Sequence, residues 1–326
     1  MKVAIVTLPL MENYGGILQN YALQQVLKEL GHDPVTIDLQ PTLAFKWYFR
    51  GILRMLVKGV PYRKFFLDRP AVYDAFVKEH IRTTPVVRCY RKRLLRDADA
   101  VVVGSDQVWR YLYNKRRLPD MFLRFARGFK GRKVVYAASF GTDTWDAPEK
   151  VRDLCSRLSR QFDCLSVRED SGVSTCRQYL HREAVRMPDP VLLLTASDYL
   201  DLCKDVAKDG QGYILSYLLD ENPAAEERVG ELQKQTGLPV KRCSGGSTSE
   251  LGIPEWLALF RDARHVVTDS YHGLVFSRLF EKPYDLFENE ERGSARYRQI
   301  TAVTDLKQEY MRGRAYLKEA LSPASE

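Results

Sequence analysis

The chain has 326 residues, of which 45% are hydrophobic and 28% are charged. These proportions are ordinary for a globular protein and exclude a disordered, collagen-like or low-complexity chain. Fifty Lys and Arg against 42 Asp and Glu give a formal net charge of +8. At ~150 residues per domain, this length favours two domains.

The first 39 residues predict a strand–helix–strand unit. Lys2–Leu8 is rich in β-branched residues, and hydrophobic residues then recur at helical spacing through Ile17–Leu30. Pro34 prevents the helix from continuing, and Val35–Leu39 predicts a second strand. The apolar stretch near residue 1 resembles a signal peptide, but it is short and lacks a small-residue cleavage site. We therefore expect a strand there and a cytoplasmic protein.

The rest of the chain alternates predicted strands and helices, with a restart after Asp209-Gly210. This order predicts an α/β fold of two Rossmann-like domains with mainly parallel sheets. We expect an N-terminal domain at 1–188, a C-terminal domain at 189–304, and a helix in 305–326 that can cross back to the first domain. Met187–Pro190 is the candidate linker. Strands are expected at 100–104, 133–139, 164–167, 184–187, 213–218, 239–243, 265–269 and 284–287, and helices at 147–161, 224–236, 254–263 and 274–280.

Two segments of the chain are similar to each other. Asp97–Ser105 and Asp262–Ser270 agree at five of nine positions, and each leads through a predicted strand to a serine. Ligands of open α/β sheets bind at the carboxyl ends of the strands. We therefore expect Ser105, Asp106 and residues 269–272 to lie in site loops that face one interdomain cleft. Chance is the alternative explanation for so short a match.

Two residues that follow predicted strands are the main candidates for chemistry. His272 follows strand 265–269, where an imidazole can donate or accept a proton near neutral pH. The alternative is a capping loop in which His272 is merely packed. Arg168 follows strand 164–167, where a guanidinium can bind a carboxylate or phosphate through two hydrogen bonds. The alternative for Arg168 is a salt bridge to Glu169, Asp170 or another residue of the domain.

Two further segments are weaker candidates for binding. Asn13-Tyr14-Gly15-Gly16 is neither a dinucleotide fingerprint nor a Walker loop, but its glycines allow a ligand to approach a helix start closely. The alternative is a tight turn. Glu288–Arg298 carries Arg292 and Arg296, which could close on an anion, although a solvated loop is the simpler interpretation of that segment alone.

The positive charge is concentrated in one region. Residues 43–133 hold 23 Lys and Arg against 7 Asp and Glu. This excess predicts an anionic partner: a phosphate-bearing substrate, nucleic acid or a membrane surface. A basic aromatic insert at about 43–96 begins with 43–64, where basic residues recur every fourth position, as in a helix on an anionic membrane. The alternative is a helix packed on the domain with a solvated basic face.

The six cysteines favour neither a disulfide scaffold nor a zinc site. They form no CxxC pair and have no histidine at zinc spacing, so reduced structural thiols are expected. No cluster of histidine and aspartate suggests another metal, and no cofactor is expected.

Several motifs together resemble the polysaccharide pyruvyl transferase family. They are VTLPLMENYGGILQNYALQQVLKELGH, VVVGSDQVW, VVYAASFG, LSVRED, DPVLLL and VVTDSYHGLVFSRLFEKPYDLF, in this order over roughly residues 1–300. The resemblance implies a GT-B-like arrangement of two domains with the active site in the cleft between them. It also implies transfer of pyruvate from phosphoenolpyruvate (PEP) onto two hydroxyls of a sugar, forming a cyclic ketal in a cell-surface polysaccharide or its lipid-linked precursor.

The resemblance also assigns roles to residues. It implies that His272 is catalytic, that Arg168 binds PEP, and that Arg292 or Arg296 supplies further positive charge. Ser270 and Tyr271 precede the histidine and depart from the residues that some relatives carry there. A GT-B glycosyltransferase that uses a nucleotide sugar is one alternative, and a non-catalytic anion- or polysaccharide-binding protein is another. No nucleic acid partner is expected, because the basic region matches no nucleic-acid-binding module.

Overall fold

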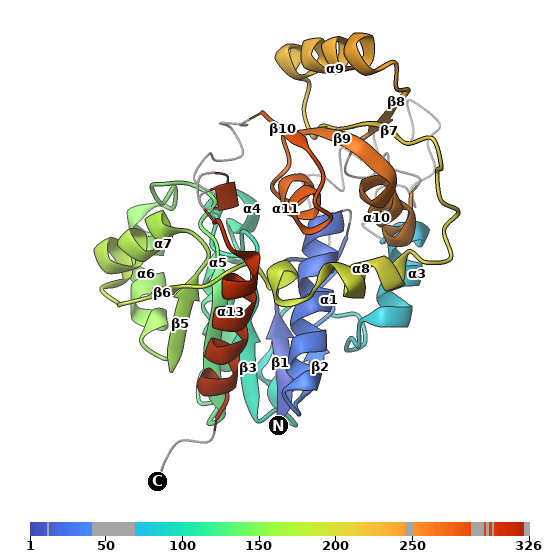
Figure 1. Ribbon diagram of the computed structural model, residues 1–326. Coiled ribbons are helices and arrows are strands. Elements are labelled where there is room, and N and C mark those ends of the chain that lie inside the picture. Colours follow the sequence, from blue (N-terminus) through green and yellow to red (C-terminus); the bar gives the residue numbers. More distant parts are fainter. Residues whose placement is uncertain are drawn as a thin grey trace, which may run out of the picture.

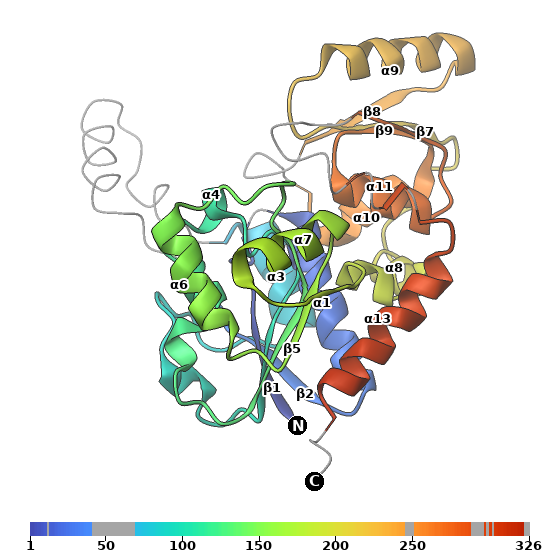
Figure 2. The same ribbon diagram turned by 90° about the vertical axis from the view of Figure 1, so that its left-hand side faces the viewer.

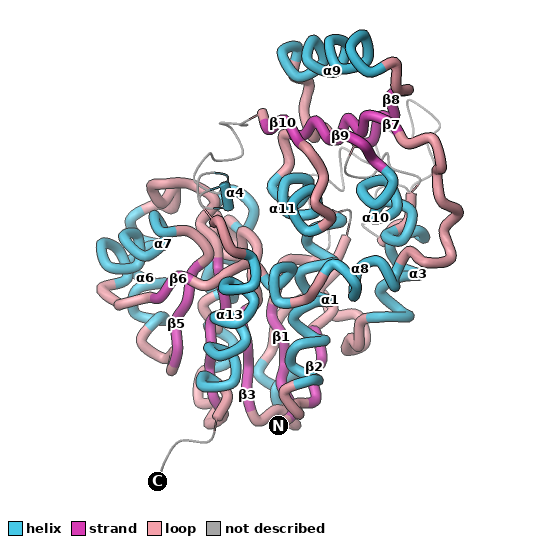
Figure 3. The backbone as a smooth tube through the Cα atoms, viewed as in Figure 1, coloured by secondary structure: helices cyan, strands magenta, loops and turns pink. Residues whose placement is uncertain are grey.

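The computed structural model describes residues 1–11, 13–40, 69–244, 251–287, 297, 300, 301 and 303–322. It contains two sheets, each of which has helices on both sides (Figure 1). The described strand pairings within both sheets are parallel, which confirms the predicted α/β fold. Figure 3 shows the two sheets as separate groups of strands, with the larger group next to the N-terminus.

The first sheet has six strands in the order β2-β1-β3-β4-β5-β6. Successive residues of a strand point to opposite faces, so each strand contributes to two cores. Val3 and Ile5 pack beneath helix α1 (Tyr14–Glu29), whereas Ala4 and Val6 belong to the core on the other face. The strands are β1 (Lys2–Val6), β2 (Asp33–Thr36), β3 (Ala100–Val103), β4 (Arg132–Ala138), β5 (Cys164–Val167) and β6 (Val185–Arg186).

Local sequence explains where α1 begins and ends. The Asn13 side chain accepts a hydrogen bond from the Gly16 amide and caps the helix, which starts at Tyr14 rather than at Ile17 as predicted. The helix ends beside Gly31, whose φ of +81° suits a residue without a side chain. The helices up to β6 are α1 (Tyr14–Glu29), α3 (Ala71–His80), η2 (Lys92–Leu95), α4 (Tyr111–Asn114), α5 (Leu118–Met121), η3 (Arg124–Ala126), α6 (Glu149–Ser159), α7 (Asp170–Thr175) and η4 (Cys176–Leu180).

The second sheet has four strands in the order β10-β9-β7-β8. Helix α9 covers one face, and α10 and α11 cover the face that looks toward the first sheet (Figure 1). The elements are η5 (Pro190–Leu193), α8 (Ala196–Leu202), β7 (Tyr213–Tyr217), α9 (Pro223–Thr236), β8 (Val240–Cys243), α10 (Ile253–Asp262), β9 (Ala263–Thr268), α11 (Tyr271–Leu279) and β10 (Tyr284–Leu286).

The two sheets are joined by a continuous hydrophobic core. One cluster of buried residues runs from Val3 and Ile5 of β1 through Tyr14 to Trp256 and Phe276 of the second domain. The Tyr14 ring stacks on the Trp256 ring at 5.0 Å between centroids, and its hydroxyl donates a hydrogen bond of 2.9 Å to the Leu251 carbonyl. The start of α1 is therefore part of the domain junction.

The last helix, α13 (Leu306–Ala320), packs against the first sheet. Figure 2 shows it running from the second domain along the first domain toward the C-terminus. Arg132 Nε of β4 donates 2.8 Å to the Ala320 carbonyl, and the Tyr316 hydroxyl donates 3.2 Å to the Val135 carbonyl. At its start, Glu309 binds both terminal nitrogens of Arg186 at 3.0 and 2.6 Å.

Several predicted elements differ in their boundaries. Strand 35–39 was placed too late, because β2 spans Asp33–Thr36 and the chain beyond it makes an isolated bridge from Leu39 to Val87. Helix 274–280 was also placed too late, because Ser270 caps α11 and the helix begins at Tyr271. The predicted linker is buried: Asp189 is fully buried, and η5, which follows it, packs against α1 and α13. Residues 43–64, Arg292 and Arg296 lie outside the described residues.

No helix in the described ranges is both long and apolar enough to cross a bilayer. The six cysteines, all described, are free thiols, as predicted.

Candidate active site

Three predicted site residues from different elements meet at Asp189. This carboxylate is fully buried between β6 and η5, where Oδ1 accepts the Val191 amide at 3.0 Å. Oδ2 accepts a hydrogen bond of 2.9 Å from Arg168 Nη1, and it lies 3.7 Å from His272 Nε2 and 3.4 Å from the Ser105 hydroxyl. Because β3, β5, β6 and α11 all contribute to this point, the carboxyl edge of the first sheet meets the second domain here.

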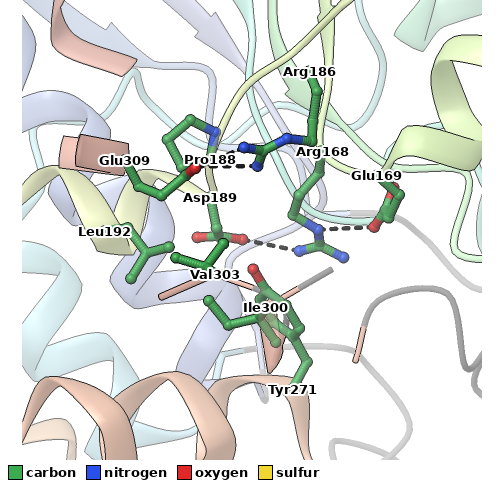
Figure 4. A pocket seen from close by; sticks show the side chains of 10 residues that line it. All are labelled: Arg168, Glu169, Arg186, Pro188, Asp189, Leu192, Tyr271, Ile300, Val303 and Glu309. Atoms are coloured by element: carbon green, nitrogen blue, oxygen red, sulfur yellow. Dashed lines mark hydrogen bonds and ion pairs between the residues drawn. The ribbon is translucent and has the colours of Figure 1, made fainter. Parts of the chain in front are cut away.

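Arg168 is held on every side. It is 2% exposed, with Nε donating to Glu169 at 2.9 Å and Nη2 donating to the Ser139 hydroxyl at 3.2 Å. The guanidinium carbon lies 4.3 Å from the centroid of the Tyr271 ring. Figure 4 shows these two side chains next to each other. The neighbouring carboxylates raise the pKa of Arg168 well above its ordinary value despite burial, so it stays charged. The salt bridge considered as the alternative for Arg168 is thus present.

The buried carboxylate beside it is also kept ionised. Burial alone would raise the pKa of Asp189, but His272, Arg168 and the Val191 amide outweigh burial and lower it to about 2. The charge pair therefore persists at neutral pH.

His272 has a ring nitrogen available for chemistry. It lies in the first turn of α11, 8% exposed, and its Nε2 has no hydrogen-bond partner among the residues that the structure describes. Buried polar atoms without a partner are rare and demand an explanation, such as a ligand or a catalytic role. The other ring nitrogen faces α1, because a Cβ atom added to Gly15 would lie 1.9 Å from His272 Nδ1.

This contact predicts that Gly15 positions His272. We expect Gly15→Ala to push the imidazole out of place and to lower turnover at least ~10²-fold, since a misplacement of ~1 Å can cost that much. Gly16→Ala is the matched control, because its added Cβ would meet only Asn13, at 3.2 Å, and alanine suits a helix. The measurement is kcat of both variants, with circular dichroism to verify folding. Equal activity of the two variants would contradict the positioning role.

The backbone is strained where β3 and β4 end. Asp106 and Ala137 have φ angles of +66° and +47°, which residues with a side chain rarely adopt. Such strain costs of order 1–3 kcal/mol each and clusters at functional sites. The strained backbone positions groups near Arg168 and Asp189. The Asp106 carbonyl accepts a hydrogen bond of 2.9 Å from the Ser139 amide, and the Ser105 hydroxyl lies 2.9 Å from the Ala137 carbonyl.

A small cavity adjoins this network (Figure 4). Its volume is ≈ 10 Å³, room for about one water molecule. The two arginines in its lining face three carboxylates, so the lining is formally negative. The lining residues are Arg168, Glu169, Arg186, Pro188, Asp189, Leu192, Tyr271, Ile300, Val303 and Glu309.

The other predicted residues take different positions. Ser270 caps α11 by accepting the Gly273 amide at 3.3 Å, and Asp106 lies 4.0 Å from Arg168. Asp269 binds the Leu219 amide within its own domain at 2.7 Å. Asn13 is an exposed helix cap, and Tyr14 is buried in the domain junction described above. The structure thus brings His272, Arg168, Tyr271, Ser105 and Asp106 together around Asp189, with Gly15 against His272.

Sequence reasoning missed Asp189 and Ser139. Asp189 lies in the predicted linker and in the DPVLLL motif, and Ser139 lies in VVYAASFG, the two motifs being the only signal that the sequence gives for these residues. Both roles depend on contacts between distant strands. Within the described ranges, no group of three or more His, Cys, Asp or Glu side chains is placed to hold a metal ion.

Comparison of structures supports the fold. The UDP-GlcNAc 2-epimerase from Neisseria meningitidis, bound to UDP-GlcNAc, matches with a TM-score of 0.51 and 12% identity, over 98% of this chain and 99% of that one. The corresponding enzyme from Methanocaldococcus jannaschii gives 0.49 and 12%, over 97% and 99%. The wall teichoic acid polymerase TagF gives 0.47 and 9%, over 98% and 88%. Of these three, only the first exceeds 0.5, and at that identity it supports the GT-B-like arrangement alone.

Comparison of sequences shows the family. No curated protein matches the chain. The polysaccharide pyruvyl transferase family, however, matches residues 13–284, which include Asp189, Arg168 and His272. Since this match spans most of the chain, the protein belongs to the polysaccharide pyruvyl transferase family and is a transferase.

Proposed function

We propose that the enzyme transfers pyruvate from PEP onto two hydroxyls of a sugar, in a cell-surface polysaccharide or its lipid-linked precursor. The products are a cyclic ketal and phosphate. The observation that carries this proposal is the Nε2 of His272, which makes no hydrogen bond to the described residues and lies 3.7 Å from Asp189 in the Arg168–Asp189 pair, at the domain junction of a pyruvyl transferase family member.

The reaction needs one proton to move onto carbon and two oxygens to bond to the neighbouring carbon. The methylene carbon of PEP gains a proton and becomes a methyl group, one sugar hydroxyl adds to C2, and the second hydroxyl displaces phosphate. The proton lost by one sugar hydroxyl balances the proton gained by the methylene carbon, and the proton lost by the second hydroxyl leaves with phosphate. His272 Nε2 would donate or accept one of these protons, a role worth typically ~10²–10⁴-fold in rate.

The cavity beside Arg168, at ≈ 10 Å³, is too small for PEP, so the donor would bind next to it and would face the charges of its lining. PEP is a trianion near neutral pH, whereas the lining has three carboxylates against two arginines, each already paired. Charge from outside this lining must therefore compensate PEP. We propose that Arg292 and Arg296 provide it, with Arg168 held as a preorganised charge behind the donor.

The test is calorimetric titration of PEP into the wild type and into Arg292→Gln and Arg296→Gln. Loss of one charge-assisted contact should weaken binding ~10–100-fold, since hydrogen bonds to charged groups contribute ~1.5–3 kcal/mol. Arg177→Gln is the control, because Arg177 pairs with Glu183 on the surface. Saturable PEP binding that is unchanged in both site variants would contradict their assignment.

The same titration separates the proposal from its main alternative. A GT-B glycosyltransferase would bind a sugar nucleotide and would not bind PEP, so titrations with UDP-GlcNAc and PEP give opposite results for the two functions. Where PEP binds, release of phosphate in the presence of a panel of sugars and polysaccharides identifies the acceptor. Binding of neither ligand would favour a non-catalytic polysaccharide-binding role.

A lipid-linked acceptor would be large and would lie at a membrane surface. The basic segment 43–64, which lies outside the described residues, remains our proposed contact with an anionic membrane at the cytoplasmic face. Sedimentation with vesicles tests it, and equal binding to anionic and neutral vesicles would contradict it.

A further inference from the structure

A second hollow lies in the first domain, apart from the site around Asp189. It is lined by Val86–Cys89, Arg91, Arg93 and Leu94, and its volume is ≈ 290 Å³, close to the lower end of the ~300–1,000 Å³ that is typical of ligand sites. It shares no lining residue with the cavity beside Arg168. We call it the Arg88–Arg93 hollow.

The walls of this hollow are held by the fold. Val87 forms a bridge with Leu39, and Arg88 Nη1 donates 3.0 Å to the Gln40 carbonyl. Below the rim, the buried Tyr90 donates its hydroxyl to the Thr7 carbonyl at 3.1 Å and stacks on Phe125. The backbone of the hollow is therefore anchored to the segments that follow β1 and β2, although the arginine side chains at its rim are exposed.

The charge of the hollow is not compensated. From Arg82 to Arg96 the chain has six basic residues and no acidic one. Among the described residues, no carboxylate forms an ion pair with Arg88, Arg91 or Arg93, whereas the nearby surface arginines Arg82 and Arg124 each have an aspartate partner. Like charges placed together without counter-charges destabilise a protein, which suggests that an anion offsets them.

We propose that the Arg88–Arg93 hollow binds a phosphate ester. Guanidinium groups match phosphate oxygens in a two-pronged geometry, and three of them suit a group with a charge near −2. The apolar part of the lining, Val86, Val87 and Leu94, suits the carbon side of an ester better than a bare ion. A lipid headgroup and a soluble phosphate ester share this chemistry. The inference is independent of the proposed function, because the hollow and the donor site have no residue in common.

Cys89 provides a reporter inside the hollow. Its thiol is exposed and lies 3.4 Å from Arg91 Nε, whereas the other cysteines are at least half-buried. Burial raises the pKa of Cys155 and Cys176 to about 12, so these thiols stay protonated and unreactive. Alkylation by uncharged iodoacetamide, followed by mass spectrometry of the Cys89 peptide, therefore reads the occupancy of this hollow.

The experiment measures the alkylation rate of the full chain at constant ionic strength. The probes are glycerol 3-phosphate and vesicles of phosphatidylcholine with and without phosphatidylglycerol. We expect saturable protection of Cys89. In the double variant Arg91→Gln/Arg93→Gln, the probe concentration that gives half-maximal protection of Cys89 should rise ~10-fold or more. Arg157→Gln/Arg160→Gln, which removes the same charge from exposed positions at the end of α6, is the matched control and should leave protection unchanged.

Each outcome of this experiment either supports or overturns the proposal. Protection by glycerol 3-phosphate supports a site for soluble phosphate esters, and protection by phosphatidylglycerol vesicles alone supports a headgroup site. Protection by neither probe, or equal loss in the control variant, would overturn the proposal. Stronger protection by a DNA oligonucleotide than by either probe would also overturn it, in favour of nucleic acid. Because PEP titration of the same variants reports on the donor site, failure here is distinguishable from failure of the proposed function.

Discussion

Replacing His272 with glutamine is expected to reduce turnover by ~10²–10⁴-fold while leaving PEP binding and folding nearly unchanged. Glutamine places an amide near the position of Nε2, so it fills the space but transfers no proton at neutral pH. The reason to expect a large effect is that the Nε2 atom lies 3.7 Å from Asp189 but makes no hydrogen bond to any described residue. Its loss should therefore affect chemistry more than stability.

The measurement is the release of phosphate from PEP with an acceptor found in the screen above. His265→Gln is the matched control, since His265 lies on β9 of the same domain and binds Asp285 at 2.8 Å, away from the junction. A His272→Gln enzyme with normal kcat would show that the imidazole only packs against Gly15. Comparable losses in both histidine variants would indicate damage to the second domain instead.

The second large effect is expected for Asp189→Asn. This change removes one of the two carboxylates that pair with the buried Arg168 at 2.9 Å, and breaking a buried pair by removing one partner costs about 3–5 kcal/mol. Asp153→Asn, on the exposed face of α6, should change stability by less than ~0.5 kcal/mol. Urea unfolding of the wild type, Asp189→Asn and Asp153→Asn at pH 7 measures both changes in the free energy of unfolding. Full stability of Asp189→Asn would show that Glu169 alone suffices to neutralise Arg168.

The pH dependence of this loss has a definite sign. The pKa of Asp189 is lowered to about 2, below the ~3.9 of an unfolded aspartate. Its carboxylate therefore contributes its full stability above about pH 4, and that contribution is lost as the pH falls toward about 2. The stability gap between the wild type and Asp189→Asn should therefore narrow as the pH falls from about 4 toward 2. A gap that widens in acid would contradict the charge pair.

The fold was largely predictable because its signals are local. The strands of both sheets are short apolar runs, and 164–167 was placed at its observed bounds. Helix starts were less accurate, since Asn13 and Ser270 cap their helices three residues earlier than the apolar spacing alone indicates. Helix α3 lies inside the predicted basic insert, where the sequence pattern does not indicate a separate helix. Its buried Tyr73 and Phe76 pack against rings of α1, a contact that the sequence does not reveal.

The site was only partly predictable, for a related reason. His272 and Arg168 follow strands, so the architecture alone marked them as candidates. Asp189 follows β6 inside a proline-rich stretch that is typical of linkers, and only the approach of Arg168 and His272 makes it central. The contact between Gly15 and His272 joins residues of different domains, and no local pattern encodes it.

The return of α13 to the first sheet has a consequence for biosynthesis. Arg132 and the Ala320 carbonyl that it binds are 188 residues apart in the chain. Leu317, Ala320 and Leu321 complete the core that Val3, Ile5 and Tyr136 begin. Because ribosomes release a protein from its N-terminal end, this face of the first sheet stays partly uncovered while the second domain is translated. We therefore expect ribosome-bound chains that stop before Leu306 to depend on chaperones, and the N-terminal domain to reach its final stability only after α13 has emerged.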